Sequence, residues 1–283
     1  MNRTAYVNGE FTPLKDAKIS ILDRGFLFAD GIYEVSAVLD GRLVDKDAHM
    51  QRLLRSVGEI QLSLPETLER VIEIQIELIR LNNLTEGIVY IEVTRGVADR
   101  DFLFPKDARP TLVMFTQEKK IVDSPVAKTG IAVKSVPDIR WARRDIKSVG
   151  LLAQVLAKQA AQAENCQEAW MVEDGFVTEG GSSSAFIVTN NRVLITRPNS
   201  SAILSGCTRK ATVKLAQEYQ IRVEERPFTL AEAQGAAEAF MTSASAFVMP
   251  IVRIDGCDVG NGKPGPLTSR LREIYIEFCR TAA

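Results

Sequence analysis

Lys147 is the residue whose position in the sequence first suggests chemistry. The residues before it, Gly130–Pro137, alternate like a β-strand. After it, aliphatic residues recur at helical spacing, at Leu151, Leu152, Val155 and Leu156. Most lysines are solvated surface charges, but a lysine at the junction of a strand and a helix can point its amine out of the packed layers. We therefore treat Lys147 as a candidate nucleophile.

A second candidate, Glu179, lies in the segment Val177-Thr-Glu-Gly-Gly-Ser-Ser-Ser. The glycines after this carboxylate let the backbone approach a ligand closely, and the serines add hydroxyl groups. A lysine, a carboxylate and small hydroxyl residues are the groups that a pyridoxal 5′-phosphate (PLP) site needs. Taken alone, the same pattern also fits an exposed glutamate in a turn.

The sequence argues against several other kinds of site. His49 is the only histidine, so a zinc site built on a histidine cluster, or a Ser-His-Asp triad, would depend on that one residue. The four cysteines have neither metal-ligand nor CxxC spacing, and we expect free thiols in a reducing compartment. We predict no metal site.

Length and composition are those of an ordinary globular protein. The 283 residues are enough for two domains or one large one, and the formal net charge of −1 does not suggest nucleic acid or a membrane surface as a partner. The sequence opens with neither a long apolar run nor a cleavable signal. A cytoplasmic location is therefore the expectation.

The first part of the chain predicts several strands and two helices. Residues 4–12 predict a hairpin that turns at Asn8-Gly9. A strand over 32–39 and a second strand over 42–44 predict another hairpin. Asp47 is the expected N-cap of the first helix, in which Arg52 lies off the apolar face. That face consists of Met50, Leu53, Leu54, Val57 and Ile60.

A second helix over 66–83 leads to strands over 88–95 and 111–116. The loop between these strands carries Phe102, Leu103 and Phe104. A solvated loop rarely carries three such residues together, so we expect this loop to close over another surface.

The composition shifts to charged residues over 118–124, ahead of Pro125, and we place a domain boundary there. The predicted domains are 1–119 and 126–283, joined by a linker over 120–125. The second domain carries Lys147, and it continues with hairpins about Asp174-Gly175 and Asn190-Asn191.

Six blocks of the sequence, in this order, resemble one enzyme family. They are Asp23-Arg-Gly with Asp30-Gly-Ile-Tyr-Glu, His49-Met-Gln-Arg-Leu, Val93-Thr-Arg-Gly, Asp145-Ile-Lys-Ser with Leu156-Ala-Lys-Gln, Val177-Thr-Glu-Gly, and Gly206-Cys-Thr-Arg. The family is the fold-type IV PLP enzymes, and the similarity is greatest to its D-amino-acid transaminases. The resemblance implies an α+β fold with a smaller N-terminal α/β domain and a larger, β-barrel-like C-terminal domain with helices.

The resemblance also implies roles for single residues. Lys147 would be the Schiff-base lysine and would carry the proton between the substrate α-carbon and the cofactor. Glu179 would keep the pyridine nitrogen protonated, and Arg52 would bind the phosphate. The other implied cofactor contacts, several of them near the helix that begins after Gly206, are Leu204, Cys207, Thr208, Ser243 and Ala244.

The sequence departs from the family at three of these positions. Cys207 stands where relatives usually have isoleucine, and Ala244 where they often have threonine. The resemblance implies that the substrate carboxylate is held by Tyr33 and by Arg100 on the loop of the neighbouring subunit, which is why it implies a dimer. Phe102 stands where D-amino-acid transaminases have a histidine. This change either weakens carboxylate binding or enlarges an apolar wall that admits primary amines. Tyr33, taken alone, also fits a core or edge tyrosine.

We therefore predict a homodimeric PLP enzyme that moves an amino group from a D-amino acid, such as D-alanine, to a 2-oxo acid, such as 2-oxoglutarate, by a ping-pong cycle. The alternatives are a branched-chain L-amino-acid transaminase, an (R)-amine transaminase and an aminodeoxychorismate lyase. An inactive PLP carrier is the alternative from another class, against which the presence of both Lys147 and Glu179 argues. The sequence does not identify the preferred side chain or the acceptor.

Overall fold

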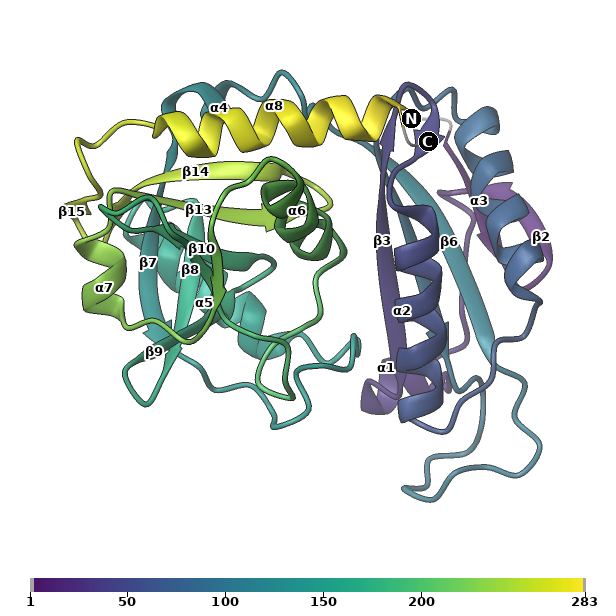
Figure 1. The fold of residues 1–283 in the computed structure, drawn as a ribbon. Helices are drawn as coiled ribbons and strands as arrows, with labels where there is room; N and C mark the ends of the chain where they lie inside the picture. Colours follow the sequence, from purple (N-terminus) through teal and green to yellow (C-terminus); the bar gives the residue numbers. More distant parts are fainter. Residues whose placement is uncertain (1–2, 282–283) are drawn as a thin grey trace. The chain divides into compact units, whose positions relative to one another are not determined.

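The computed structural model describes residues 3–281, which form two compact units (Figure 1). The first unit comprises the residues up to Lys120 together with Ile146–Gly150, and the second comprises Ile121–Asp145 and Leu151–Thr281. The segment that carries Lys147 therefore groups with the first unit, whereas the sequence placed it in a continuous domain over 126–283. Its backbone hydrogen bonds to the first unit, described below, explain this difference.

The first unit contains one mixed set of strands and helices. Its elements are β1 (Thr4–Val7), β2 (Glu10–Pro13), α1 (Arg24–Phe28), β3 (Gly31–Leu39), β4 (Arg42–Leu43), α2 (Lys46–Glu59), α3 (Leu68–Leu81), β5 (Glu86–Thr94) and β6 (Thr111–Glu118).

The strands of this unit form a sheet in the order β2-β1-β6-β5-β3-β4. Strands β3 and β5 pair antiparallel along their whole length, from Gly31 opposite Thr94 to Leu39 opposite Glu86. Helix α2 packs on β3, and α3 packs on β1 and β6. Their apolar faces form a core with the sheet that includes Met50, Leu53, Val57, Val71, Ile74, Leu78, Ile91 and Met114.

The segment Ile146–Gly150 lies along the first half of β3, where β4 does not reach. The Tyr33 N–H donates to the Lys147 carbonyl at 2.9 Å, and the Val149 N–H donates to the Gly31 carbonyl at 3.1 Å. An antiparallel bridge joins Ile32 and Ser148. The segment thus satisfies backbone groups of β3 that would otherwise lie at a sheet edge.

The second unit has more strands and is larger. Its elements are α4 (Pro125–Thr129), β7 (Ile131–Pro137), α5 (Leu152–Ala163), β8 (Glu168–Glu173), β9 (Phe176–Gly180), β10 (Ser184–Val188), β11 (Leu194–Thr196), α6 (Cys207–Glu218), β12 (Val223–Glu225), α7 (Leu230–Gln234), β13 (Glu238–Ser243), β14 (Phe247–Ile254), β15 (Cys257–Asp258) and α8 (Pro266–Thr281).

The strands of this unit form a sheet in the order β12-β11-β10-β13-β14-β7-β8-β9, with β15 paired to β14. Although β9 and β10 are not neighbours in this order, they contact each other. The sheet therefore curls toward a barrel, as Figure 1 shows. Helix α5 packs on β7 and β8, whereas α6 and α8 pack on β13 and on each other.

One helix begins earlier than predicted, and another carries an exposed apolar stripe. Helix α2 begins after Asp45, two residues before the position expected from Asp47 as N-cap, and Asp47 lies in its first turn. Helix α5 forms as predicted, but its aliphatic stripe is not buried in the second unit. Leu152, Val155 and Leu156 are 71%, 59% and 52% exposed, while the smaller Ala157 and Ala161 face the sheet.

None of the helices within residues 3–281 combines the length and the apolar character needed to cross a membrane.

Candidate active site

The Lys147 side chain lies over an aromatic ring of the first unit. Its Nζ is 4.0 Å from the centroid of the Tyr33 ring. Its backbone N–H donates to the Ser56 hydroxyl on α2 at 3.3 Å. The structure thus brings Lys147 and Tyr33 together, as the proposed roles of these two residues require.

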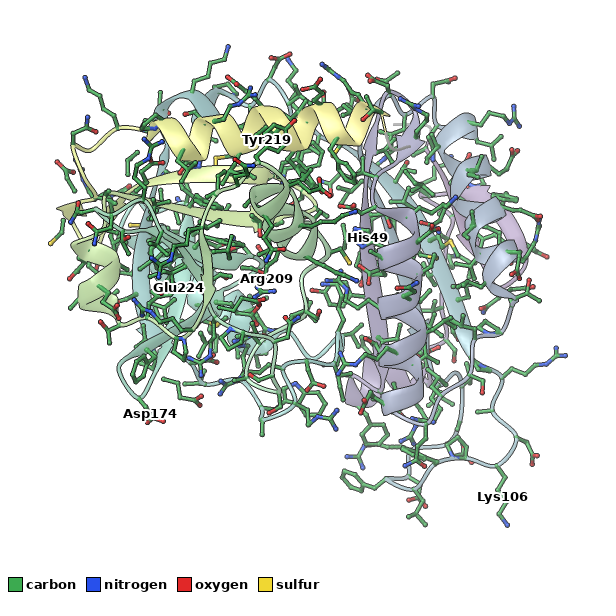
Figure 2. All side chains as sticks on the ribbon, in the orientation of Figure 1. His49, Lys106, Asp174, Arg209, Tyr219 and Glu224 are labelled. Atoms are coloured by element: carbon green, nitrogen blue, oxygen red, sulfur yellow. The ribbon has the colours of Figure 1, made fainter. Side chains whose placement is uncertain are left out.

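Arg52 lies on α2 beside a carboxylate and a histidine that the sequence did not assign to the site. Its Nε and Nη2 donate to the two carboxylate oxygens of Glu34 at 2.9 and 2.5 Å. Glu34 Oε1 is also 2.9 Å from Nδ1 of His49. Figure 2 shows His49 beside the α2 ribbon. Arg52 is therefore held by ionic contacts and is not a solvated surface residue.

Burial by itself would raise the pKa of Glu34. The charges and hydrogen bonds of Arg52 and His49 outweigh this effect, so that the pKa lies well below the ordinary value of a glutamate. Glu34 therefore remains ionised beside Arg52 at neutral pH.

Arg100 and Phe102 lie on the long loop between β5 and β6. Phe102 packs against Phe28, with ring centroids 5.4 Å apart, and the Arg100 guanidinium is 5.4 Å from the Phe28 centroid and 5.7 Å from the Phe102 centroid. Phe102 and Leu103 are each 77% exposed. Lys106 marks the far end of this loop in Figure 2. The loop does not bury its apolar residues within the first unit.

Glu179 lies at the end of β9 in the second unit and is only 4% exposed. Arg140 Nη1 donates to its Oε1, and the Leu204 N–H lies 3.1 and 3.2 Å from its two oxygens. Burial raises the pKa of Glu179, and the charge and hydrogen bond of Arg140 act in the opposite direction. Arg140 thus favours the ionised form that a protonated ring nitrogen would need.

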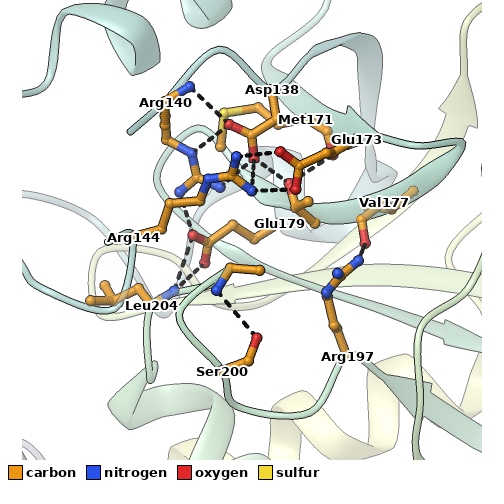
Figure 3. A network of polar contacts seen from close by, with 12 residues as sticks. Asp138, Arg140, Arg144, Met171, Glu173, Val177, Glu179, Arg197, Ser200 and Leu204 are labelled. Atoms are coloured by element: carbon orange, nitrogen blue, oxygen red, sulfur yellow. Dashed lines mark hydrogen bonds and ion pairs between the residues drawn. The ribbon is translucent and has the colours of Figure 1, made fainter. Parts of the chain in front are cut away.

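Arg140 is itself held in place by the polar network shown in Figure 3. Its Nε and Nη2 donate to Asp138 at 3.0 and 2.7 Å, and the Thr178 hydroxyl donates to the same carboxylate at 2.6 Å. Burial would raise the pKa of Asp138, but these hydrogen bonds lower it overall. Arg144 lies 3.4 Å from Asp138 and also pairs with Glu173.

The turn of small residues after Glu179 is supported by a second buried carboxylate. Glu168 Oε2 is 2.9 Å from Lys158 Nζ and accepts from the Ser183 hydroxyl at 3.1 Å. A side chain at Gly180 would collide with Ser183, because a Cβ built there lies 2.0 Å from its Oγ. The small size of residue 180 thus leaves room for the Ser183 hydroxyl that donates to Glu168.

The remaining predicted cofactor residues lie at two turns of the second unit. Cys207 and Thr208 open α6 after Gly206, so the first N–H groups of that helix lie where an anion is favoured. Ser243 and Ala244 lie where β13 turns into β14. Phe247, just after this turn, has a φ of 57°, which is rare for a bulky side chain and indicates local strain.

Arg272 of α8 holds the turn between β13 and β14 by hydrogen bonds. Its Nη1 donates to the carbonyls of Ala246 and Val248 at 2.9 and 2.7 Å. Its Nη2 donates to the carbonyls of Ile121 and Val122 at the start of the unit. The Ser243–Ala244 turn thus has a fixed support.

These donors fit the chemistry of PLP. By residue type, Lys147 would supply an amine for an aldehyde, Glu179 a buried carboxylate for a ring nitrogen, and Arg52 and the start of α6 donors for a phosphate. Sequence reasoning missed Glu34, His49 and Arg140. A signal for Glu34 was available, since a glutamate at an inward position of a strand needs a charged partner.

Comparison with known proteins identifies the family. Residues 31–254 match the family described as amino-transferase class IV. The D-alanine aminotransferase of Staphylococcus haemolyticus is 41% identical over 276 residues, which cover 96% of each chain. That of Bacillus licheniformis is 36% identical over 266 residues, which cover 94% of this chain and 93% of the relative. This chain belongs to the class IV amino-transferases.

The fold agrees with this membership. The crystal structure of the branched-chain aminotransferase of the archaeon Thermoproteus uzoniensis with norvaline matches 98% of this chain and 94% of its own, with a TM-score of 0.88 and 25% identity. A branched-chain amino acid aminotransferase crystallised with pyridoxamine 5′-phosphate matches the same shares, with a TM-score of 0.90 and 23% identity. The predicted fold type IV is therefore confirmed. Since the family depends on PLP, the predicted cofactor and enzyme class are also confirmed, and the chain is a PLP-dependent aminotransferase.

Proposed function

We propose that this aminotransferase moves the amino group of a D-amino acid, such as D-alanine, to a 2-oxo acid, such as 2-oxoglutarate, by a ping-pong mechanism. The observation that carries the proposal is the placement of the Lys147 amine over the Tyr33 ring at the edge of β3. The D-alanine aminotransferases at 36–41% identity support the substrate class.

When bound, PLP supplies an aldehyde that bonds to a lysine amine and a ring that accepts the electrons left by the departing α-proton. Lys147 provides the amine and then moves the proton at the substrate α-carbon. Glu179, whose ionised form Arg140 favours, would hold the proton on the ring nitrogen. Arg52, Thr208 and Ser243, with the N–H groups of Cys207 and Ala244, bind the phosphate, and Leu204 packs on the ring.

In this proposal the substrate carboxylate is bound by the Tyr33 hydroxyl and by Arg100 of the second subunit of the dimer. Phe102 cannot donate a hydrogen bond to it. The loss of one such bond costs about 1–3 kcal/mol in a buried site, which weakens binding while Arg100 keeps the counter-charge. A substrate without a carboxylate, such as a primary amine, would suffer less from this change.

We further propose that the enzyme is a homodimer. The exposed stripe of α5 and the exposed apolar residues of the β5–β6 loop support this, because exposed apolar side chains that lie together often face a partner. The cytoplasmic location, and the absence of nucleic acid and membranes as partners, stay predictions from the sequence.

A half-reaction screen tests the proposed function. Purified, PLP-loaded enzyme is mixed with D-alanine, L-leucine, L-valine and an (R)-amine in turn, and the visible absorbance of the bound cofactor is followed. Rapid loss with D-alanine, recovery with 2-oxoglutarate and release of pyruvate are expected. Reaction only with L-leucine or L-valine, or only with the amine, would contradict the proposal and favour the corresponding alternative.

A further inference from the structure

We propose that Glu34 is a positioning residue for the phosphate of PLP, which it serves by fixing the guanidinium of Arg52. This inference rests on the proposed function, in which Arg52 binds that phosphate. Glu34 itself would not touch the cofactor.

Glu34 is oriented toward α2 by the alternation of β3. Ile32, Glu34 and Ser36 are buried, whereas Tyr33 and Val35 between them are only half-buried. Tyr33 faces the Lys147 amine, so the opposite face of the same strand presents Glu34. Tyr33 and Glu34, which are consecutive in β3, therefore contact the two residues of the proposed site. Tyr33 contacts Lys147, to which we assign the aldehyde, and Glu34 contacts Arg52, to which we assign the phosphate.

The partners of Glu34 come from one face of α2. His49 and Arg52 are three positions apart, which places them side by side on a helix. A carboxylate without solvent needs such partners, since burying an unpaired charge is costly. A carboxylate oxygen only accepts hydrogen bonds, so Nδ1 of His49 carries the proton in the 2.9 Å contact with Oε1.

The contacts between Glu34 and Arg52 orient the guanidinium as well as neutralise its charge. Two nitrogens of one guanidinium donate to the two oxygens of one carboxylate, an arrangement that fixes the plane and the rotation of the fork. A glutamine at position 34 offers one oxygen acceptor, and its amide NH₂ would face an arginine donor. Arg52 would then leave its present orientation.

Charge and geometry predict opposite effects on PLP binding. Replacing Glu34 by glutamine removes a negative charge near Arg52, so long-range attraction alone would strengthen the binding of a phosphate. If the orientation of Arg52 matters more, the same replacement weakens phosphate binding. The sign of the change therefore distinguishes the two effects.

The experiment compares PLP with pyridoxal, which has the same aldehyde and no phosphate. Dissociation constants of both for the full chain are measured by absorbance titration, in the wild type, Glu34→Gln, Arg52→Met and the double variant. We expect Glu34→Gln to raise the Kd of PLP roughly tenfold, and to change the Kd of pyridoxal less than about twofold. In the double variant the effect of Glu34→Gln should disappear, because its target is gone.

Two further variants keep the test decisive. Glu34→Asp retains the charge but shortens the side chain, and it should weaken PLP binding to an intermediate degree with pyridoxal unaffected. Ser36→Ala, on the same face of β3, is the matched control and should leave both constants unchanged. Glu34→Asp remains informative if Glu34→Gln does not fold.

Several outcomes would overturn the proposal. Equal losses for PLP and pyridoxal would mean that Glu34 only stabilises the fold, and tighter PLP binding would mean that charge alone matters. Unchanged PLP binding in Arg52→Met would mean that Arg52 does not bind the phosphate, although the chain could still be a transaminase. A wild-type chain that binds no PLP would overturn the proposed function itself.

Discussion

The Nζ of Lys147 lies 4.0 Å from the centroid of the Tyr33 ring, and the backbones of the two residues are joined by a 2.9 Å hydrogen bond from the Tyr33 N–H to the Lys147 carbonyl. The backbone bond fixes where the lysine leaves the edge of β3, and the ring favours one direction for the amine. A cation over an aromatic face gains about 0.5–2 kcal/mol. Strand β3 therefore sets the position of the proposed nucleophile.

Replacing Lys147 by alanine should abolish turnover and the visible absorbance of covalently bound PLP, because it removes the amine to which we assign the covalent bond. The measurement is the absorbance spectrum of the PLP-loaded variant together with its rate of D-alanine consumption. Lys15→Ala, which removes an exposed lysine of the same unit, is the control and should leave both unchanged. An unaltered spectrum in Lys147→Ala would assign the cofactor to another lysine.

Tyr33→Phe should separate the two roles that we give to Tyr33. The ring remains, so the Lys147 amine keeps its neighbour and the bound cofactor keeps its spectrum. The lost hydroxyl should raise the KM for D-alanine by about 5- to 150-fold, which corresponds to 1–3 kcal/mol. Tyr33→Ala should change both the spectrum and the KM. If Tyr33→Phe leaves the KM unchanged, the hydroxyl does not bind the substrate.

Arg140→Met should move the acid limb of the pH profile upward. Burial raises the pKa of Glu179 and Arg140 opposes this effect, so the loss of Arg140 raises the pKa further. The ionised carboxylate then persists only at higher pH, and the acid limb of kcat/KM for D-alanine should shift upward. Arg140→Lys should restore part of the shift.

The matched control for this variant is Arg197→Met, which removes an arginine that donates to the Val177 carbonyl and not to Glu179. Its pH profile should coincide with that of the wild type. Because Arg140 also pairs with Asp138, thermal melting of each variant is recorded, and the position of the acid limb is read from folded protein. If the acid limb of the kcat/KM profile does not move in Arg140→Met, Arg140 does not control the ionisation of Glu179.

Phe102→His should lower the KM for D-alanine, because it adds the hydrogen-bond donor that the family resemblance implies at this position. It should also decrease any activity toward a primary amine, which offers no carboxylate to this donor. Lys106→Ala, on the same loop, is the control for a general effect on loop structure. Unchanged KM values in Phe102→His would place residue 102 outside the carboxylate site.

Much of this fold could be predicted from local patterns of the sequence. The Asn8-Gly9 turn, the strand at β3 and the helix at α5 follow from turn residues and from periodicities that one segment carries by itself. The spacing of the apolar residues in α5 predicts a helix but not which surface its apolar side covers. An apolar side that faces a partner has the same spacing as one that faces the core.

The polar supports of the site were harder to predict because they join distant residues. Glu34 and Arg52 come from a strand and a helix, and Arg140 meets Glu179 across 39 positions of sequence. Nothing in the local pattern around Arg52 separates a buried ion pair from a solvated face. The family resemblance supplied roles for Lys147, Glu179 and Arg52, but not the residues that hold the last two in place.

The exposed stripe of α5 leads to the final prediction. Leu152, Val155 and Leu156 are more than half exposed although their spacing is that of a buried helix face. If this face lies in the homodimer interface, Leu152→Lys combined with Leu156→Lys should place two charges in an apolar contact and favour the monomer. Sedimentation velocity over a range of protein concentrations measures the shift. Tyr219→Lys, at a half-exposed aromatic residue that ends α6, is the control and should leave the association unchanged. A double variant that dimerises like the wild type would show that the stripe lies outside the dimer interface.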